Sequence, residues 1–337
     1  MRSLKIAIEH WPLKAPFRIA GYEFTQSDVV VVSLSERGIT GMGEAAGVYY
    51  RRETPETMRD QIEAARADIE RGIDRNGLRE RMPAGGARNA VDCALWDLEA
   101  KLNRTPAWQS AGLPALGPLP TTYTIGADTP EAMAEVARSY APASRIKMKL
   151  TGEDDAARVA AVRCARPNAW IGVDANQAFS RASLEALMPA LVEAKVGLIE
   201  QPIPIGQEAQ LDGFRSPIPL AADESVQGLA DIAKAKGRFE IVSIKLDKCG
   251  GLTEALLMVR AIRAAGMRPM VGCMEGTSLA MMPGALVGQL CDFVDMDGAM
   301  FLARDRAPSV TYRDGDIICT TDGWGSAQMS PHLRAAS

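Results

Sequence analysis

The sequence predicts an α/β protein: a (β/α)₇β TIM-like barrel with an N-terminal α+β capping domain that the C-terminal tail completes. From about residue 121, short apolar or β-branched runs alternate with amphipathic stretches of helix length, a pattern typical of parallel strands covered by helices. Before that point three strands come first and the helices follow. We therefore place the capping domain at 1–120, with 304–337 returning to it, and the barrel at 121–303.

The capping domain is predicted from strand patterns followed by helical periodicity. Residues 4–9 and 28–34 have strand character, and the turn SERG leads into a third strand, ITGMGEA. We expect helices at 55–71, 75–81 and 87–103, the last with apolar residues at helical spacing. The glycines of GMGEAAG lie within a hairpin, which favours a turn over a dinucleotide-binding loop.

Eight runs supply the barrel strands, and seven helical segments, such as LTEALLMVRAIRAAG, connect them. The runs are TTYTIG (121–126), RIKMKL (145–150), WIGVDA (170–175), GLIEQP (197–202), PLAADE (219–224), EIVSIKL (240–246), RPMVGCM (268–274) and DFVDMD (292–297). Eight parallel strands at this spacing close into a barrel. The tail that follows predicts a hairpin with Asp314-Gly315 as its turn, which we expect to rejoin the capping domain.

The bulk composition argues against several classes of protein. The net charge is −4 and no run of five or more Lys or Arg exists, so we expect no nucleic-acid partner. No signal-peptide core is seen, and the longest mostly apolar stretch, 279–290, is too short for a membrane span. Six cysteines without CxxC spacing indicate reduced thiols in a cytoplasmic protein and no zinc site. The two histidines, His10 and His332, lie near no nucleophile motif and are interpreted as structural.

Charged residues recur at the C-terminal ends of the predicted barrel strands, the rim where barrel enzymes form their active sites. They are Lys147, Lys149, Asp174, Glu200, Asp223, Lys245, Asp295 and Asp297. Solvated rim charges are the structural alternative. Because burying an unpaired charge is costly, so many charges at matching positions favour a site.

Asp174, Glu200 and Asp223 are each about one βα unit apart, so they should converge from adjacent strands. Three oxygen ligands without nearby His or Cys suit a hard cation such as Mg²⁺. Asn176 is expected to hydrogen-bond around this site.

Lys147 and Lys149 are two residues apart and should both point into the barrel, while Lys245 lies four strands further round. Two amines on opposite sides of a metal-bound carboxylate can remove a proton from one face of a carbon and deliver one to the other. Burial and nearby positive charge should lower the pKa of such a lysine. Asp295 and Asp297 share a strand face and suit a cationic group such as a peptide ammonium; an ion pair with a nearby Lys or Arg is equally compatible.

The K-x-K of Lys147 and Lys149, the segments VDAN, IEQP and ADES, and IKLDKCGG around Lys245 resemble the enolase superfamily, muconate-lactonizing subgroup, over nearly the whole chain. Within it, VDMDG is similar to the D-x-D motif of dipeptide epimerases, notably L-Ala-D/L-Glu epimerases. PAGGARNAVDCALWDLEAK and KLDKCGGLTEAL resemble the proteobacterial branch of that family.

The resemblance implies that Lys149 and Lys245 are the acid/base catalysts and that Asp174, Glu200 and Asp223 bind Mg²⁺. It implies that a dipeptide substrate is bound by Thr124, Lys147, Cys273, Glu275, Asp295 and Asp297. It also implies recycling of murein peptides in the cytoplasm. We further expect a homo-oligomer.

Two positions depart from the family pattern. Alanyl-glutamate epimerases carry an arginine in the loop after the first strand, whereas here that loop reads PFRIAGYEFTQS, with Gly21 and Tyr22 at the corresponding positions and Arg18 as its one cation. Glu275 stands where an apolar residue is expected, and an acid there would favour a polar or cationic substrate side chain.

Three other functions compete with epimerisation. Cycloisomerases and o-succinylbenzoate synthases of the same superfamily need no partner for an ammonium group, so the pair Asp295 and Asp297 argues against them. An imine-forming aldolase would use a barrel lysine such as Lys245, but the three acids argue against it. A non-catalytic binding protein on the same barrel predicts the loss of a ligand or lysine, and none is lost.

Overall fold

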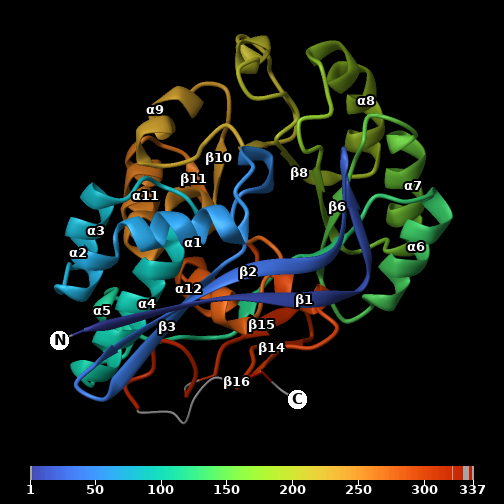
Figure 1. The fold of residues 1–337 in the computed structure, drawn as a ribbon. Helices are drawn as coiled ribbons and strands as arrows, with labels where there is room; N and C mark the ends of the chain where they lie inside the picture. Colours follow the sequence, from blue (N-terminus) through green and yellow to red (C-terminus); the bar gives the residue numbers. More distant parts are fainter. Residues whose placement is uncertain (1, 321, 329–333, 336–337) are drawn as a thin grey trace.

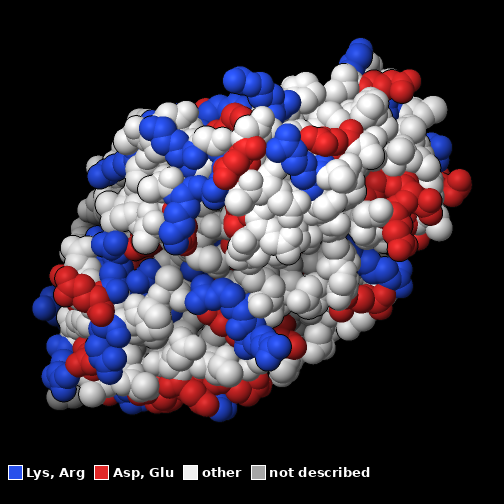
Figure 2. Space-filling model, turned by 90° about the horizontal axis from the view of Figure 1, so that it is seen from above, with Lys and Arg blue, Asp and Glu red and all other residues white. Residues whose placement is uncertain are grey.

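The computed structural model describes residues 2–320, 322–328 and 334–335. In Figure 1 a long antiparallel ribbon, β1 (Ser3–Ile19) and β2 (Tyr22–Glu36), runs across the barrel. Figure 2 shows Lys and Arg interspersed with Asp and Glu on the face seen from above. Among the described residues, no helix is long and apolar enough to cross a membrane.

The capping domain is an antiparallel sheet in the order β1-β2-β3, with helices packed against it. Its remaining elements are β3 (Ile39–Ala45), α1 (Pro55–Ala64), α2 (Arg66–Glu70), α3 (Arg75–Arg81) and α4 (Gly86–Leu102), followed by the short α5 (Ala107–Ser110). The single helix expected at 55–71 is therefore two helices. They separate where the Ala65 N–H bonds to the Ile62 carbonyl at 3.0 Å, a tighter turn than that of an α-helix.

The first two strands are much longer than the sequence suggested. The segment PFRIAGYEFTQS, expected to be a loop, forms the end of the β1–β2 ribbon around a turn at Gly21, whose φ is +77°. The register shifts between Pro12 and Phe17. Prolines at 12 and 16 lack an N–H and interrupt the strand pattern, which hides this part of β1 in the sequence.

The predicted last helix of the capping domain is confirmed as α4 and is buried along nearly its whole length. It lies directly on β3, because a Cβ atom at Gly41 would be 2.3 Å from the Leu98 nitrogen, and one at Gly43 would be 2.2 Å from the Ala90 carbonyl oxygen. Two glycines on one face of β3 thus allow close contact between strand and helix backbones.

The eight predicted barrel strands are confirmed, in the order of the chain and all parallel. They are β5 (Tyr123–Ile125), β6 (Arg145–Lys149), β7 (Trp170–Asp174), β8 (Val196–Glu200), β9 (Leu220–Ala222), β10 (Ile241–Ile244), β11 (Arg268–Gly272) and β12 (Phe293–Asp295). The first and last strands meet where the Thr122 N–H donates to the Val294 carbonyl at 3.1 Å. This contact brings the two ends of the sheet together.

The expected seven helical connections are not all helices. Full helices occur in five of the connections, and four of these hold a single helix: α6 (Pro130–Ser139), α7 (Asp155–Ala165), α8 (Arg181–Glu193) and α12 (Ser278–Gly288). After β10 come α10 (Leu246–Cys249) and α11 (Leu252–Ala264), and after β9 only η3 (Leu229–Asp231) and α9 (Ile232–Ala235). Between β8 and β9 there is one 3₁₀ turn, η2 (Glu208–Leu211), because four prolines and two glycines within residues 202–219 disfavour a helix.

The tail hairpin is confirmed, with β14 (Thr311–Arg313) and β15 (Asp316–Ile318) joined at Asp314-Gly315. It does not join the β1–β3 sheet. Instead β15 pairs with β4 (Leu119–Pro120), the segment that enters the barrel, and β13 (Arg306–Ala307) pairs with β16 (Arg334–Ala335). A contact with the capping domain comes further on, where the Gly325 N–H donates to Asp97 of α4 at 2.8 Å. His332 lies outside the described residues.

Candidate active site

The charged residues predicted at the strand ends lie together at one end of the barrel. Lys149, Asp174 and Glu200 are aligned in register on β6, β7 and β8. Asp223 and Lys245 directly follow β9 and β10. All five are buried, with at most 7% of each residue exposed. Parallel strands account for this arrangement, since their carboxyl ends share one edge.

Each carboxylate of the predicted metal set is paired with a lysine. Lys149 Nζ is 2.6 Å from Asp174 Oδ2, and Lys147 Nζ is 3.1 Å from Glu200 Oε2 and 3.4 Å from the same Asp174 oxygen. Lys245 Nζ is 2.8 Å from Asp223 Oδ2. The predicted amines and acids therefore alternate around the barrel mouth.

This pairing differs from the expectation that the three acids converge on one point. Within the described part of the chain, no three His, Cys, Asp or Glu side chains are arranged to hold one metal ion. The amines lie between the carboxylates instead, because opposite charges at this depth pair with one another.

The donor set nevertheless fits a hard divalent cation. Six carboxylates at this end of the barrel are at least 95% buried, against four buried amines, which leaves two carboxylates in excess. The acids are Asp174, Glu200, Asp223, Glu224, Asp295 and Asp297, and the amines are Lys147, Lys149, Lys245 and Lys248. In addition, Glu200 Oε1 has no hydrogen-bond partner among the described residues. A dication matches both the excess charge and the free oxygen.

The pKa values of the carboxylates reflect that excess. Burial raises the pKa of Glu200 to about 7 and that of Glu224 to about 8, with Asp174 and Asp223 adding to both increases. Burial also acts to raise the pKa of Asp223, but the amines of Lys245 and Lys248 outweigh it and hold that pKa well below its usual range.

Burial and nearby charges act on the pKa of Lys245 in opposite directions. Burial does lower it, but the carboxylates of Asp223 and Glu200 outweigh burial, so the pKa of Lys245 is raised. The nearby carboxylates therefore affect the pKa of Lys245 more than the neighbouring amine of Lys147 does.

Asp295 and Asp297 have different surroundings although they lie two residues apart. Asp295 forms an ion pair with Lys147 and accepts hydrogen bonds from the Thr122 and Thr124 hydroxyls. Asp297 accepts the Thr124 N–H at 2.6 Å and, among the described residues, has no Lys or Arg within ion-pair distance. The lysine partner that the sequence left open thus exists for Asp295, while Asp297 is available to another cation.

Cys273 and Glu275 follow β11 and face the capping domain. Burial raises the pKa of the Cys273 thiol. The Ser27 hydroxyl donates to the Glu275 carbonyl at 2.6 Å, which ties β2 to the barrel. Glu275 also lines a cavity of about 350 Å³ together with Asp28, Glu53 and other residues of the capping domain.

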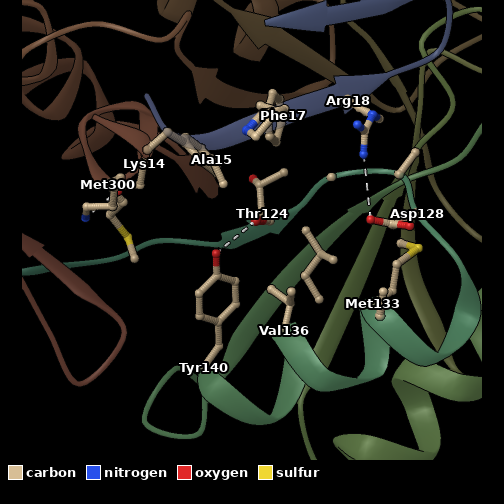
Figure 3. Close-up of a pocket in the computed structure, with 16 residues that line it drawn as sticks. Lys14, Ala15, Phe17, Arg18, Thr124, Asp128, Met133, Val136, Tyr140 and Met300 are labelled. Carbon is tan, nitrogen blue, oxygen red and sulfur yellow. Dashed lines mark hydrogen bonds and ion pairs between the residues drawn. The ribbon is translucent and has the colours of Figure 1, made fainter. Parts of the chain in front are cut away.

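A second cavity, of about 310 Å³, lies between the β1–β2 ribbon and α6, with Thr124 in its wall (Figure 3). Arg18 reaches this cavity from β1, and Figure 3 shows its guanidinium pointing toward Asp128, 3.9 Å away. Its Nε also donates to Glu23. The one cation of this segment is therefore already paired with two acids.

Four residues at the site were not predicted from the sequence. Lys248 donates to Asp223 Oδ1 at 2.7 Å, and Gln201 accepts the Asp223 N–H at 2.9 Å. Glu224 adds a fourth acid, and Tyr49 from η1 (Tyr49–Arg51) lies close enough for Glu224 to raise its pKa in addition to burial. The second lysine of KLDK and the glutamate of ADES were the available sequence signals.

The chain is similar to known proteins over most of its length. The model of the enolase C-terminal domain-like family matches residues 131–325, and that of the mandelate racemase / muconate lactonizing enzyme N-terminal domain matches residues 1–112. An L-Ala-D/L-Glu epimerase from Escherichia coli (strain K12) is 38% identical over 319 residues, which cover 94% of this chain and 99% of that protein.

Two solved structures extend the similarity to the fold. An enolase family member from Agrobacterium tumefaciens with homology to dipeptide epimerases, with bound sodium and L-Ala-L-Glu, has a TM-score of 0.94 and 39% identity, covering 96% of this chain and 100% of that chain. A dipeptide epimerase from Methylococcus capsulatus complexed with Mg and L-Arg-D-Lys has a TM-score of 0.88 and 30% identity, covering 94% and 96%. The chain belongs to the enolase superfamily, in the family of mandelate racemase and muconate lactonizing enzyme.

Proposed function

We propose that the protein is a dipeptide epimerase that inverts the Cα of the C-terminal residue by two-base 1,1-proton transfer, with L-Ala-D/L-Glu as its substrate. The observation that carries the proposal is the position of Lys149 and Lys245 at the ends of β6 and β10, four strands apart in the barrel. Each amine lies beside a carboxylate of the acid cluster. The similarity to an L-Ala-D/L-Glu epimerase supports the same reaction.

Asp174, Glu200 and Asp223 are the residues that would hold Mg²⁺. When bound, the ion would stabilise the negative charge that develops on the substrate carboxylate as the carbon acid loses its proton. The Methylococcus relative complexed with Mg supports this choice of cation. The carboxylates that would hold the ion are paired with lysines, and their release would free the amines of Lys149 and Lys245 for the substrate.

The two lysines then divide the proton transfer between them. One amine accepts the proton from one face of the Cα, and the other amine donates a proton to the opposite face, so the configuration is inverted. Lys149 and Lys245 exchange these roles when the reaction runs in the other direction. Tyr49 of the capping domain is buried beside the acid cluster, where it would limit the access of water to this step.

Residues on the other side of the barrel mouth would orient the substrate. Asp297, which has no cationic partner among the described residues, would accept the α-ammonium group of the dipeptide together with Asp295. Lys147 would hydrogen-bond the substrate carboxylate. Thr124, Cys273 and Glu275 would line the remainder of the pocket.

The cellular setting is part of the proposal. The six cysteines are all unpaired in the structure, which supports a reducing compartment such as the cytoplasm. There the enzyme would act on peptides released during murein recycling, as a homo-oligomer.

The test is incubation of a dipeptide library in D₂O with Mg²⁺, followed by mass measurement of deuterium at the Cα of the C-terminal residue. L-Ala-L-Glu and L-Ala-D-Glu should incorporate deuterium, whereas N-acetylglutamate, which lacks the ammonium group, should react poorly. A muconate-type cycloisomerase or an o-succinylbenzoate synthase would leave the dipeptides unlabelled and turn over its own substrate. A binding protein would label nothing.

Substitution of either base provides the decisive control. Lys149→Ala and Lys245→Ala should each abolish epimerisation, because each removes the donor or acceptor on one face. Lys234→Ala is the matched control, since Lys234 is an exposed lysine paired with Asp231 on the barrel exterior. Full turnover by both base variants would rule out the two-base mechanism.

A further inference from the structure

In the part of the chain that the structure describes, three buried oxygen atoms beside the acid cluster have no hydrogen-bond partner. They are Glu224 Oε2, Asn176 Oδ1 and Gln227 Oε1. Glu224 is 1% exposed. Leaving a buried acceptor unpaired costs about 1–3 kcal/mol, so three such atoms in one place indicate that something else satisfies them.

These three side chains form one connected group between the capping domain and the acid cluster. Asn176 Nδ2 donates to Glu224 Oε1 at 3.3 Å, and Gln227 Nε2 donates to the Glu224 carbonyl at 2.6 Å and to the Tyr50 hydroxyl at 2.9 Å. At the other end, the Asn176 N–H donates to Asp174 Oδ1 at 3.0 Å. Asn176 Nδ2 and Gln227 Nε2 thus donate within the group, and three of its oxygen atoms remain without a partner.

The backbone at this place is held in a rare conformation. Asn176 has a φ of +41° and the next residue, Gln177, has a φ of +72°. Non-glycine residues adopt such angles at a cost, and they do so where a side chain must point in a required direction. The turn after β7 is therefore bent in a way that places the Asn176 amide beside Glu224.

We propose that Glu224 and Asn176 are positioning residues that accept hydrogen bonds from the water molecules retained by Mg²⁺, and that they make the site selective for this hydrated cation. The inference rests on the proposed function, because it assumes Mg²⁺ at Asp174, Glu200 and Asp223. Unpaired oxygen atoms at this place match the outward-pointing hydrogens of such water molecules. Mg²⁺ keeps several waters in proteins, and groups that bind around a metal site tune its affinity.

A direct ligand role for Glu224 would make a different prediction. Ca²⁺ binds carboxylates in flexible geometries and loses water more readily than Mg²⁺. If Glu224 bound the cation itself, or only contributed charge, its loss would weaken the binding of Mg²⁺ and of Ca²⁺ to a similar degree. If Glu224 instead accepts hydrogen bonds from retained water molecules, its loss should weaken Mg²⁺ binding more than Ca²⁺ binding.

The experiment measures binding of MgCl₂ and CaCl₂ to the full chain by isothermal titration calorimetry without substrate. Glu224→Gln keeps the shape of the side chain but replaces one acceptor by a donor. We expect it to weaken Mg²⁺ binding ~10–100-fold and Ca²⁺ binding less than about threefold. Asn176→Ala should shift the two affinities in the same direction. Glu208→Gln is the matched control, since Glu208 accepts the Ser225 hydroxyl in the next loop at 2.8 Å and should leave both affinities unchanged.

If Glu224→Gln weakens the binding of both cations equally, or changes neither affinity, the inference is overturned and the proposed function is unaffected. Failure of the wild-type protein to bind Mg²⁺ would instead contradict the proposed function. Circular dichroism shows whether each variant is folded. If Glu224→Gln does not fold, Asn176→Ala tests the inference by the same measure, the ratio of Mg²⁺ affinity to Ca²⁺ affinity.

Discussion

At the end of β8 the buried side chain of Gln201 makes four hydrogen bonds. Its Nε2 donates to the Ile203 carbonyl at 2.8 Å and to the Ser225 hydroxyl at 2.7 Å. Its Oε1 accepts the N–H groups of Asp223 at 2.9 Å and Ser225 at 3.0 Å. Gln201, the glutamine of IEQP, therefore holds the backbone of Asp223 in position at the acid cluster.

Gln201→Leu should destabilise the protein strongly. The substitution leaves the N–H groups of Asp223 and Ser225 buried without acceptors, so the free energy of unfolding should fall by about 2–5 kcal/mol. Urea denaturation measures this change. Gln207→Leu, at an exposed position in the same loop, is the control and should change stability by less than about 0.5 kcal/mol. A loss below about 1 kcal/mol in Gln201→Leu would show that water replaces the amide.

Among the secondary-structure elements of the capping domain, β3 and α4 pack with their backbones in close contact. Gly41 and Gly43 lie on the same face of the strand, two residues apart, and both face the helix backbone. Side chains larger than hydrogen at either position would meet main-chain atoms, which cannot rotate away. The orientation of α4 relative to the sheet therefore depends on these glycines.

Gly41→Ala should separate β3 from α4. Its new methyl group would lie 2.3 Å from the Leu98 nitrogen, so the backbones must move apart, at a cost of about 3 kcal/mol. Thermal and urea unfolding test this expectation. Gly117→Ala is the matched control because an added Cβ there meets nothing within 4 Å. Equal stability of the two variants would contradict the packing argument.

At the scale of the whole molecule, buried polar contacts join the capping domain to the barrel. Arg306 from the tail pairs with Glu44 of β3 at 2.8 Å, and the Thr277 N–H donates to the same glutamate at 2.7 Å. On the side of Lys245, the Gly47 N–H donates to Asp247 Oδ1 at 3.0 Å. These contacts keep the capping domain over the barrel mouth, where it covers the acid cluster.

The contact at Asp247 predicts a pH dependence of stability. Burial, with the charges of Glu53 and Glu44, raises the pKa of Asp247 to about 7, although hydrogen bonds from Gly47 and Asn89 oppose the shift. In the unfolded chain the pKa is about 3.9. The folded state therefore binds more protons between these values, and its stability falls as the pH rises from about 4 to 7.

Asp247→Asn removes this titration and isolates its effect. Between pH 5 and pH 8 the free energy of unfolding of the wild type should fall by about 3 kcal/mol relative to that of the variant. Urea denaturation of both proteins at the two pH values gives the difference. The comparison is needed because the pKa values of Glu200 and Asp297 are also raised by burial and act in the same direction. A constant difference would show that Asp247 is ionised throughout.

Much of the site was predictable because strand ends are easy to find in a βα repeat. Lys149, Asp174 and Glu200 were placed at neighbouring strand ends from the sequence, and the structure aligns them in register. The pairing of each acid with a lysine was not predictable, since it depends on side-chain distances across strands. Neither was the long β1–β2 ribbon, whose prolines conceal its pattern.

The barrel, its eight strands and the residues at its mouth were predictable from the amino-acid sequence, because the alternation of strand and helix patterns shows which residues end each strand. Only the folded chain shows which charges pair, which of Asp295 and Asp297 lacks a lysine partner among the described residues, and how Gln201 contacts Asp223. The physical reason is that such contacts join residues far apart in the chain, and their energies depend on burial and on distances of a few ångströms.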